Sequence, residues 1–170
     1  MGNQTSYFDA FGVRNGFDGA QVGLTSELHY GPFYLSALAK VGLGGLHESA
    51  QINGGTTISA NGATSSYTGG VLAQQTNSGT HERDRLAYLC EGRIDVGWRP
   101  ANWLRVFVGY DFLFVSGVAR ASGLIDGVDS RVVPQLHPTG TSTVATYPAF
   151  SWGSNGFWVQ GLETGLELRW

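Results

Sequence analysis

The sequence predicts an all-β fold, an antiparallel up-and-down meander of five or six long strands that forms part of a transmembrane barrel of the outer-membrane type. Three observations predict it. The 170 residues include 26 glycines, and glycine weakens helices. Apolar and polar residues alternate with period two, as in strands whose two faces differ. The connections alternate between short and long, which is typical of outer-membrane barrels.

The composition excludes several other classes of protein. Hydrophobic residues make up 42% of the chain and charged residues 14%, and this balance is unlike that of a disordered chain. A formal net charge of −3, without a basic cluster, argues against a nucleic-acid partner. One cysteine, Cys90, excludes a disulfide framework and a multi-cysteine metal site. We therefore expect no cofactor and no metal.

Five alternating segments are the predicted strands, at about residues 17–30, 33–46, 84–98, 103–115 and 157–170. Proline-containing turns, Gly31-Pro32 and residues 99–102, join the first pair and the second pair. Long segments rich in Gly, Ser, Thr and Asn, at about residues 47–83 and 116–156, are the predicted extracellular loops. The segment Ser6–Val13 is compatible with one further strand, and Asn15-Gly16 with the hairpin turn that would end it.

Each predicted strand has one face without charge and one face with charges. The uncharged faces carry Val22, Leu24 and Leu28 in the first strand, Leu35, Val41 and Leu43 in the second, Leu86, Ile94 and Val96 in the third, Val106, Val108 and Phe112 in the fourth, and Leu162, Leu166 and Leu168 in the fifth. In a membrane barrel the uncharged faces meet lipid. The charges of the opposite faces are then predicted to line the lumen and to compensate one another across strands. They are Glu27, Lys40, Glu91, Arg93, Asp95, Arg105, Asp111, Glu163, Glu167 and Arg169.

Aromatic residues stand at the strand ends, where membrane barrels carry their girdles. The predicted interface aromatics are Tyr30, Phe33, Trp98, Trp103, Trp158 and Trp170. Twelve residues separate Trp158 from Trp170, which is about 40 Å along a strand and about 30 Å after a 40° tilt. This length is close to the thickness of the hydrocarbon core.

The strand count bears on the extent of the barrel. Five or six strands are fewer than the eight that the smallest single-chain barrels need, and open edges in lipid are costly. No secretory signal follows Met1. We therefore expect residues 1–170 to be a single C-terminal barrel segment, closed by missing N-terminal strands or by other chains.

Several stretches resemble the family of outer-membrane β-barrel proteins abundant in planctomycetes. They are Asn15-Gly16-Phe17, Gly19-Ala20-Gln21-Val22-Gly23-Leu24, Ala39-Lys40-Val41-Gly42-Leu43-Gly44, Gly69-Gly70-Val71-Leu72-Ala73-Gln74, Arg83-Asp84, Val108-Gly109-Tyr110-Asp111-Phe112-Leu113 and the ending from Phe157 to Glu167. The resemblance implies an outer-membrane location with lipid as partner. A terminal aromatic, here Trp170, resembles the signal that the barrel-insertion machinery reads. The family supplies no catalytic residues.

The resulting prediction is an integral outer-membrane β-barrel protein, structural or forming a passive porin-like pore, and not an enzyme. One alternative is a barrel enzyme or adhesin acting through its extracellular loops, with acids such as Asp84 at the outer rim. Another is a soluble β-barrel or sandwich that binds a ligand and buries the same apolar faces. His81-Glu82-Arg83-Asp84 lacks the second histidine of a zinc-protease motif, and we expect Arg83-Asp84 to make a structural ion pair at the rim.

Overall fold

The computed structural model describes residues 3–127 and 147–169. Within these residues the chain forms the strands β1 (Gln4–Tyr30), β2 (Phe33–Ala60), β3 (Ala63–Thr68), β4 (Gly79–Ala101), β5 (Leu104–Ala119) and β6 (Ser154–Leu168), with a single 3₁₀ turn, η1 (Ala121–Leu124). None of the helical structure in this part of the chain has the length and apolar character that a membrane span requires.

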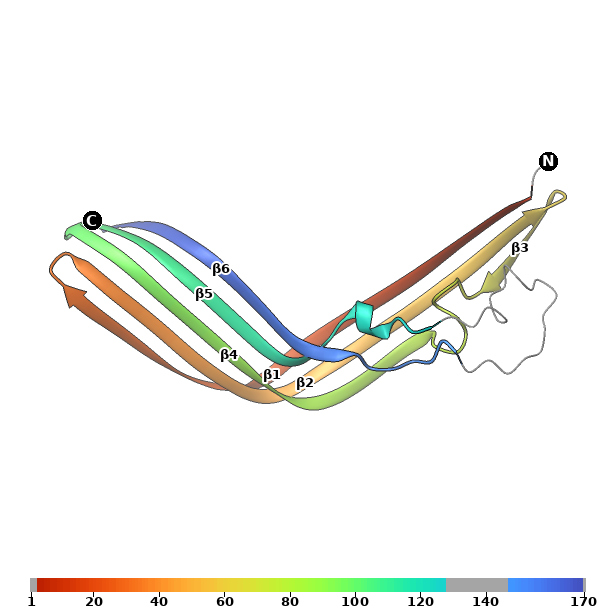
Figure 1. Cartoon of the computed structure of the whole chain (residues 1–170), viewed down its shortest axis with the longest axis horizontal. Coiled ribbons are helices and arrows are strands. Elements are labelled where there is room, and N and C mark those ends of the chain that lie inside the picture. The colour runs from red at the N-terminus through yellow and green to blue at the C-terminus, as the bar shows by residue number, and fades with distance from the viewer. Residues whose placement is uncertain (1–2, 128–146, 170) are drawn as a thin grey trace. The chain divides into compact units, whose positions relative to one another are not determined.

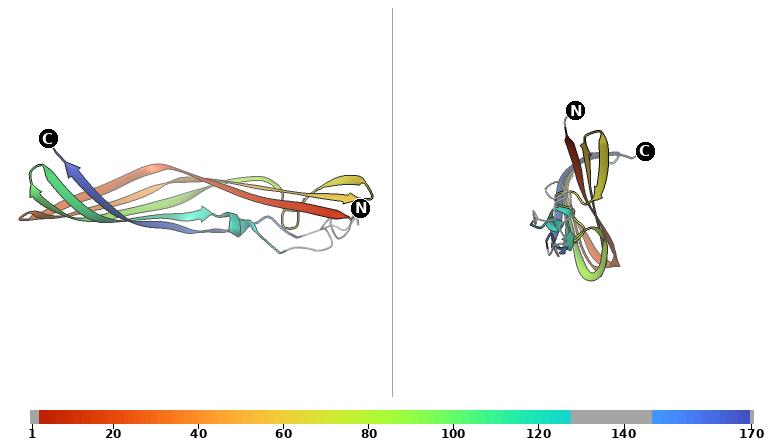
Figure 2. Two further views of the ribbon diagram at one scale, coloured as in Figure 1. Left: turned by 90° about the horizontal axis from the view of Figure 1, so that it is seen from above. Right: turned by 90° about the vertical axis from the view of Figure 1, so that its right-hand side faces the viewer.

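The strands form one sheet in the order β1-β2-β4-β5-β6, and the short β3 pairs with β2 outside this path. Neighbouring long strands lie side by side in Figures 1 and 2. The β4–β5 pairing is antiparallel and places Arg93 opposite Asp111, with a bulge between Trp98 and Ala101. The predicted all-β fold, an antiparallel meander of five to six strands, is confirmed.

The strands are longer than the sequence pattern indicates, and the expected loop over residues 47–83 is wrong for much of its length. β2 continues through residues 47–60, β3 occupies Ala63–Thr68, and β4 begins at Gly79. The second expected loop, residues 116–156, is shortened because β5 runs to Ala119 and β6 begins at Ser154. In this extension the apolar residues, such as Ala50 and Ile52, move to the even-numbered face, and the buried Glu48 and the pair Gly54-Gly55 interrupt the alternation.

The expected hairpin turn at Asn15-Gly16 is also wrong, since β1 is one continuous strand from Gln4 to Tyr30. The Asn15 side chain makes a long-range pair of hydrogen bonds. Its Nδ2 donates to the Ala119 carbonyl at 3.1 Å, and its Oδ1 accepts the Ala119 amide at 3.0 Å. Asn15 therefore joins β1 to the end of β5. In a hairpin turn, the same residue would instead have connected two adjacent strands.

The strand ends near the short connections differ slightly from the prediction. β4 extends through Pro100 to Ala101 beyond the bulge, so Trp103 lies in the turn and β5 begins at Leu104. β6 ends at Leu168, and Trp170 lies outside the described residues.

The chain divides into two compact units, each built from parts of the long strands. Unit 2 comprises Phe17–Leu46, Arg85–Val118 and Asn155–Trp170. Unit 1 comprises Met1–Gly16, His47–Asp84 and Ala119–Ser154. Its described core is small. Ala50, Ile52, Ala73 and Leu124 are buried there, and Phe11, Val13, Phe150 and Trp152 pack against them.

The segment 69–78 of unit 1 is fixed by side chains rather than by a sheet. The Asp9 carboxylate, on β1, accepts hydrogen bonds from the amides of Val71, Leu72 and Ala73 at 3.2, 3.0 and 2.8 Å. The Asn77 side chain accepts from the Gln74 amide at 2.8 Å and donates to the Leu72 carbonyl at 3.1 Å. A segment without strand or helix thus has its backbone groups satisfied, as burial requires.

Candidate functional site

Unit 2 exposes a continuous set of large apolar side chains, which we call the apolar band. Its members are Val22, Leu24, Leu28, Leu35, Val41, Leu43, Leu86, Ile94, Val96, Val106, Val108, Phe112, Leu162, Leu166 and Leu168. They come from all five long strands, and each lies on the face that the sequence predicts to be free of charge. The exposed fraction of Leu162 is 82%, and that of Ile94 is 55%.

The exposure of the apolar band differs from what a closed soluble β-sandwich or barrel shows. In a β-sandwich or soluble barrel, these residues would be buried against a second layer. Among the described residues no second layer covers them. Soluble monomers rarely expose apolar patches larger than a few hundred Å², and larger patches mark contact with protein or membrane.

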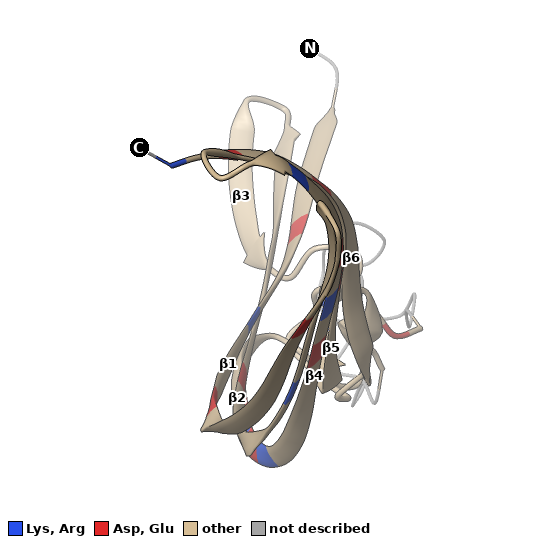
Figure 3. Cartoon of the chain, turned by 90° about the vertical axis from the view of Figure 1, so that its left-hand side faces the viewer, with Lys and Arg blue, Asp and Glu red and all other residues tan. Residues whose placement is uncertain are grey.

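The opposite face of unit 2 carries most of the charged residues, and we call it the paired-charge face. Figure 3 marks the charged positions along the strands. Lys40 on β2 pairs with Glu91 on β4 at 3.1 Å. Arg93 on β4 pairs with Asp111 on β5 at 2.6 Å and with Glu163 on β6 at 3.5 Å. The ion pairs therefore connect neighbouring and next-nearest strands across the sheet.

A second group of charges lies near the short turns, around the Arg105 side chain of β5. Its guanidinium stacks on the Tyr34 ring of β2 at 3.7 Å and pairs with Glu27 of β1 at 3.1 Å. Glu167 of β6 lies 3.9 Å from the same guanidinium. Tyr34 is only 3% exposed, since Arg105 covers its ring. One arginine thus contacts side chains from both edge strands of the sheet.

Arg169 pairs with Glu167 at 2.8 Å. With this pair, nine of the ten charged residues predicted for the lumen form ion pairs. Asp95 is the exception, and it forms no ion pair with any described residue. Its Oδ1 is buried without a hydrogen-bond partner there, close to the space where a Cβ on Gly109 would lie. The predicted compensation across strands therefore corresponds to observed contacts, while the assignment of this face to a lumen stays a prediction.

The predicted interface aromatics are exposed on unit 2. The exposed fractions are 88% for Tyr30, 53% for Phe33, 46% for Trp98, 57% for Trp103 and 56% for Trp158. Tyr30 and Phe33 flank the β1–β2 turn, and Trp98 and Trp103 stand at the β4–β5 turn. Trp170 lies outside the described residues.

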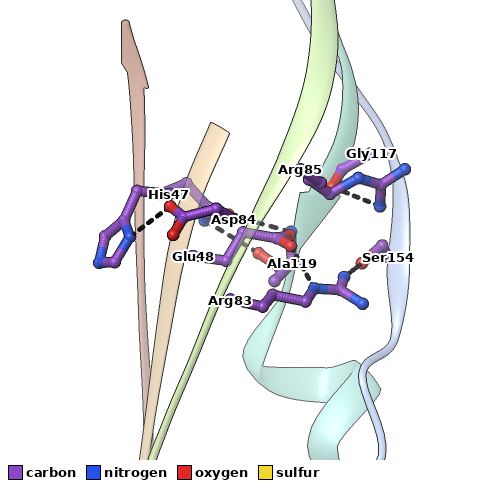
Figure 4. A network of polar contacts seen from close by, with 9 residues as sticks. His47, Glu48, Arg83, Asp84, Arg85, Gly117, Ala119 and Ser154 are labelled. Carbon is purple, nitrogen blue, oxygen red and sulfur yellow. Dashed lines mark hydrogen bonds and ion pairs between the residues drawn. The ribbon is translucent and has the colours of Figure 1, made fainter. Parts of the chain in front are cut away.

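In unit 1, two ion pairs between β2 and β4 use consecutive residues of each strand (Figure 4). His47 Nδ1 lies 2.8 Å from Asp84 Oδ1, and both side chains are exposed. Arg83 Nε donates to Glu48 Oε2 at 2.5 Å, and the Glu48 side chain is fully buried. Consecutive residues of a strand point to opposite faces. The two pairs therefore lie on opposite sides of the sheet.

This arrangement refines the expectation for Arg83-Asp84. The two residues do not pair with each other, because they face opposite sides of β4, and each instead pairs with β2. The Arg83 guanidinium also donates to Ser154 Oγ and stacks over Trp152 at 4.4 Å. Arg83 thus connects β2, β4, the start of β6 and the segment before it.

A histidine paired with a carboxylate, as in His47–Asp84, is the kind of group that the alternative of a barrel enzyme would require. The exposure and the titration of this pair therefore bear on that alternative. The hydrogen bond from Asp84, with the charge of Asp84 as the next cause, raises the pKa of His47 above its ordinary value of 6.5. Both side chains are more than half exposed, at 51% and 82%, and water weakens electrostatic effects at such sites. No cluster of three or more metal-ligating side chains occurs in the described part of the chain.

Sequence reasoning missed Arg99 and Glu48 as contributors to these contacts. It assigned no contact to Tyr34 or His29, although alternation places both on the charged face. Arg99 and His29 both lie near Glu27, at 3.8 and 2.8 Å. Gly97 marks the gap that the Tyr34 ring fills. Glu48 carried no signal, because it lies in a stretch that looked like a loop.

Residues 1–170 match the family model described as "Putative beta barrel porin-7 (BBP7)". No curated protein matches the chain, and no solved structure matches it.

Proposed function

Because the chain belongs to the beta barrel porin-7 family, whose model spans residues 1–170, we propose that unit 2 is part of a bacterial outer-membrane β-barrel that forms a passive, porin-like pore. The observation that carries the proposal is the contrast between the two faces of its sheet. The apolar band is exposed, and the opposite face holds charges in ion pairs.

The free-energy cost of the alternative orientations supports this assignment. A charge facing lipid near the bilayer centre costs about 2–4 kcal/mol for Arg or Lys in an outer-membrane barrel. When the apolar band faces lipid instead, leucine, valine and isoleucine are placed in hydrocarbon, where burial of apolar area is favourable. Lipid is therefore the proposed partner of the apolar band, and the paired-charge face lines the interior.

The proposed pore is weakly selective. Narrowly selective pores use rings of charge of one sign, whereas opposite charges alternate across the paired-charge face. The side chains of these pairs remain partly exposed, from 19% for Arg105 to 58% for Arg169. Side chains of balanced charge that stay partly exposed on the interior face support passage of small polar solutes with little preference for the sign of charge.

Barrel closure requires further strands. The sheet of the described residues has β1 and β6 at its edges, and unpaired backbone groups in lipid cost several kcal/mol each. We propose that strands from the rest of a longer chain, or from other chains, pair with these edges. The C-terminal strand ending at Trp170 is the proposed contact for the barrel-insertion machinery.

Planar bilayers test the pore directly. Full-length protein, extracted in detergent and added to one chamber, should give stepwise ohmic conductance. The double variant Arg93→Gln/Arg105→Gln should change the ratio of cation to anion permeability, because it leaves acidic partners uncompensated. A matched substitution on the lipid-facing side, Leu162→Ala, should leave that ratio unchanged. Folded, inserted protein without conductance would contradict the pore and favour a structural barrel.

A further inference from the structure

The exposed faces of β1, β2 and β4 change character partway along each strand. On β2, the odd-numbered exposed positions are apolar from Phe33 to Leu43 and then become His47, Ser49, Gln51 and Asn53. The even-numbered positions remain the more buried set on both sides of this change. The strand therefore continues without a change of register, and only the chemistry of its exposed face changes.

The same change occurs on both neighbours of β2. On β1, the exposed even-numbered face carries Phe8 and Ala10 near its start, and Arg14 and Asp18 then precede the apolar Ala20, Val22 and Leu24. On β4, it carries Glu82 and Asp84 before Leu86 and Tyr88. The His47–Asp84 contact of 2.8 Å places the transitions of β2 and β4 side by side.

The apolar stretches have the length that a bilayer requires. They run from Ala20 to Tyr30, from Phe33 to Leu43 and from Leu86 to Trp98, with exposed aromatics near the turns. Ten to twelve steps of about 3.3 Å give about 33–40 Å along a strand. A tilt of about 40° reduces this to about 25–30 Å, close to the apolar band of about 25 Å in outer-membrane barrels.

We infer that the lipid boundary crosses the sheet between Asp18 and Ala20, between Leu43 and His47, and between Asp84 and Leu86, and that β1, β2 and β4 continue into water beyond it. The His47–Asp84 pair then lies at headgroup level. The extensions, residues 4–18 on β1, 47–60 on β2 and 79–84 on β4, form a β wall outside the bilayer. This inference rests on the proposed membrane barrel and adds where its lipid contact ends.

The extensions have the properties of a wall in water. Apart from Tyr7 and Phe8 near the start of β1, the large exposed side chains of the extensions are polar, and on the other face of β2 Glu48, Ala50 and Ile52 are buried. The Asp9 carboxylate fixes the segment 69–78 to β1, and the Arg83–Glu48 pair joins β4 to β2. A loop that faces lipid cannot find hydrogen-bond partners for its backbone groups in hydrocarbon. In unit 1, side chains such as Asp9 accept hydrogen bonds from the loop backbone.

Spin labels provide the test. Full-length protein with Cys90→Ala receives one cysteine at a time on β2, at Val41, Leu43, Ser49 or Gln51, and on β4 at Glu82 or Leu86. Each labelled variant is reconstituted in phosphatidylcholine liposomes. Collision with oxygen, which concentrates in lipid, is compared with collision with a water-soluble nickel chelate by power saturation. A label at Ser36, which lies next to Leu35 on β2 but on the opposite face, is the matched control.

The inference predicts that oxygen collisions dominate at Val41, Leu43 and Leu86, and that nickel collisions dominate at Ser49, Gln51 and Glu82. The depth parameter should therefore change sign between Leu43 and Ser49. Oxygen dominance at Ser49 and Gln51 would overturn the boundary while leaving the membrane barrel intact. Nickel dominance at Val41, Leu43 and Leu86 alike would instead contradict the barrel itself.

Discussion

Consecutive residues of β2 and β4 form ion pairs in two very different environments. Glu48 is fully buried and pairs with Arg83, whose side chain is 29% exposed. Glu48 Oε1 has no hydrogen-bond partner among the described residues. The side chains of His47 and Asp84 form their pair while exposed to solvent. The buried pair should therefore matter for stability, and the open pair chiefly for the titration of His47.

Removal of Arg83, the cation that pairs with the buried Glu48, should destabilise unit 1. Arg83→Gln leaves Glu48 without its partner, and breaking a buried pair in this way costs about 3–5 kcal/mol. The double variant Glu48→Gln/Arg83→Gln should recover part of this loss, since no isolated charge remains. Urea unfolding in detergent micelles, followed by tryptophan fluorescence, measures both. Arg85→Gln is the control, because Arg85 is exposed and makes one 3.4 Å bond to the Gly117 carbonyl. Equal loss in the single and double variants would contradict the prediction.

The open pair predicts a pH dependence centred on His47. Its pKa is raised in the folded protein, first by the hydrogen bond to Asp84. The protonated pair therefore adds stability that is fully present below the ordinary pKa of 6.5 and is lost as the pH rises through the raised value. Asp84→Asn should lower the pKa of His47 toward 6.5 in an NMR titration. Glu82→Gln should lower it less, because Glu82 contributes only through charge. An unchanged pKa in Asp84→Asn would rule out this cause.

At the scale of elements, the segment 69–78 depends on a single carboxylate from β1. Three amides donate to Asp9, and hydrogen bonds to a charged group contribute about 1.5–3 kcal/mol. Asp9→Asn keeps the size of the side chain but replaces one acceptor oxygen by a donor. We expect faster hydrogen exchange at Val71, Leu72 and Ala73. The matched control Asp18→Asn, on the same strand but with an exposed side chain, should leave this exchange unchanged.

Packing between β2 and β4 predicts a second element-scale effect. A Cβ at Gly97 would overlap the Tyr34 ring, whereas a Cβ at Gly161 on β6 would meet nothing within 4 Å. Gly97→Val should therefore displace Tyr34 and Arg105 and cost about 1–3 kcal/mol, the usual range for overpacking. Gly161→Val should be neutral or slightly stabilising, since valine favours strands. Loss of stability of the same size in both variants would show that any bulk on this face is harmful.

For the whole molecule, the two faces predict opposite responses to charge. Ile94→Arg places a cation near the middle of the apolar band, where the cost in an outer-membrane barrel is about 2–4 kcal/mol. Glu82→Arg, on the same face of β4 beyond the band, should change the free energy of unfolding by less than about 0.5 kcal/mol. Equilibrium folding into liposomes measures both. A negligible effect of Ile94→Arg would indicate that the band faces water.

The sequence determined the class of fold and the two-faced character of unit 2. Alternation over the predicted strands placed Leu162 and Ile94 on the exposed apolar face, and it placed Lys40 and Glu91, which form an ion pair, on the other. This worked because successive side chains of a strand point to opposite faces, so a strand with one apolar and one polar face must alternate with period two. The pattern is local, so it can be read without knowledge of the partners.

Only the tertiary structure decided how far the strands continue and which charges meet. Residues 47–60 lack a clear strand pattern because Glu48 and Gly54-Gly55 interrupt the alternation. The burial of Glu48, Ala50 and Ile52 depends on segments far along the chain. The partners of Arg83 and Arg105 likewise come from strands distant in sequence. Such contacts depend on strand order and register, which bring together residues that no local pattern relates.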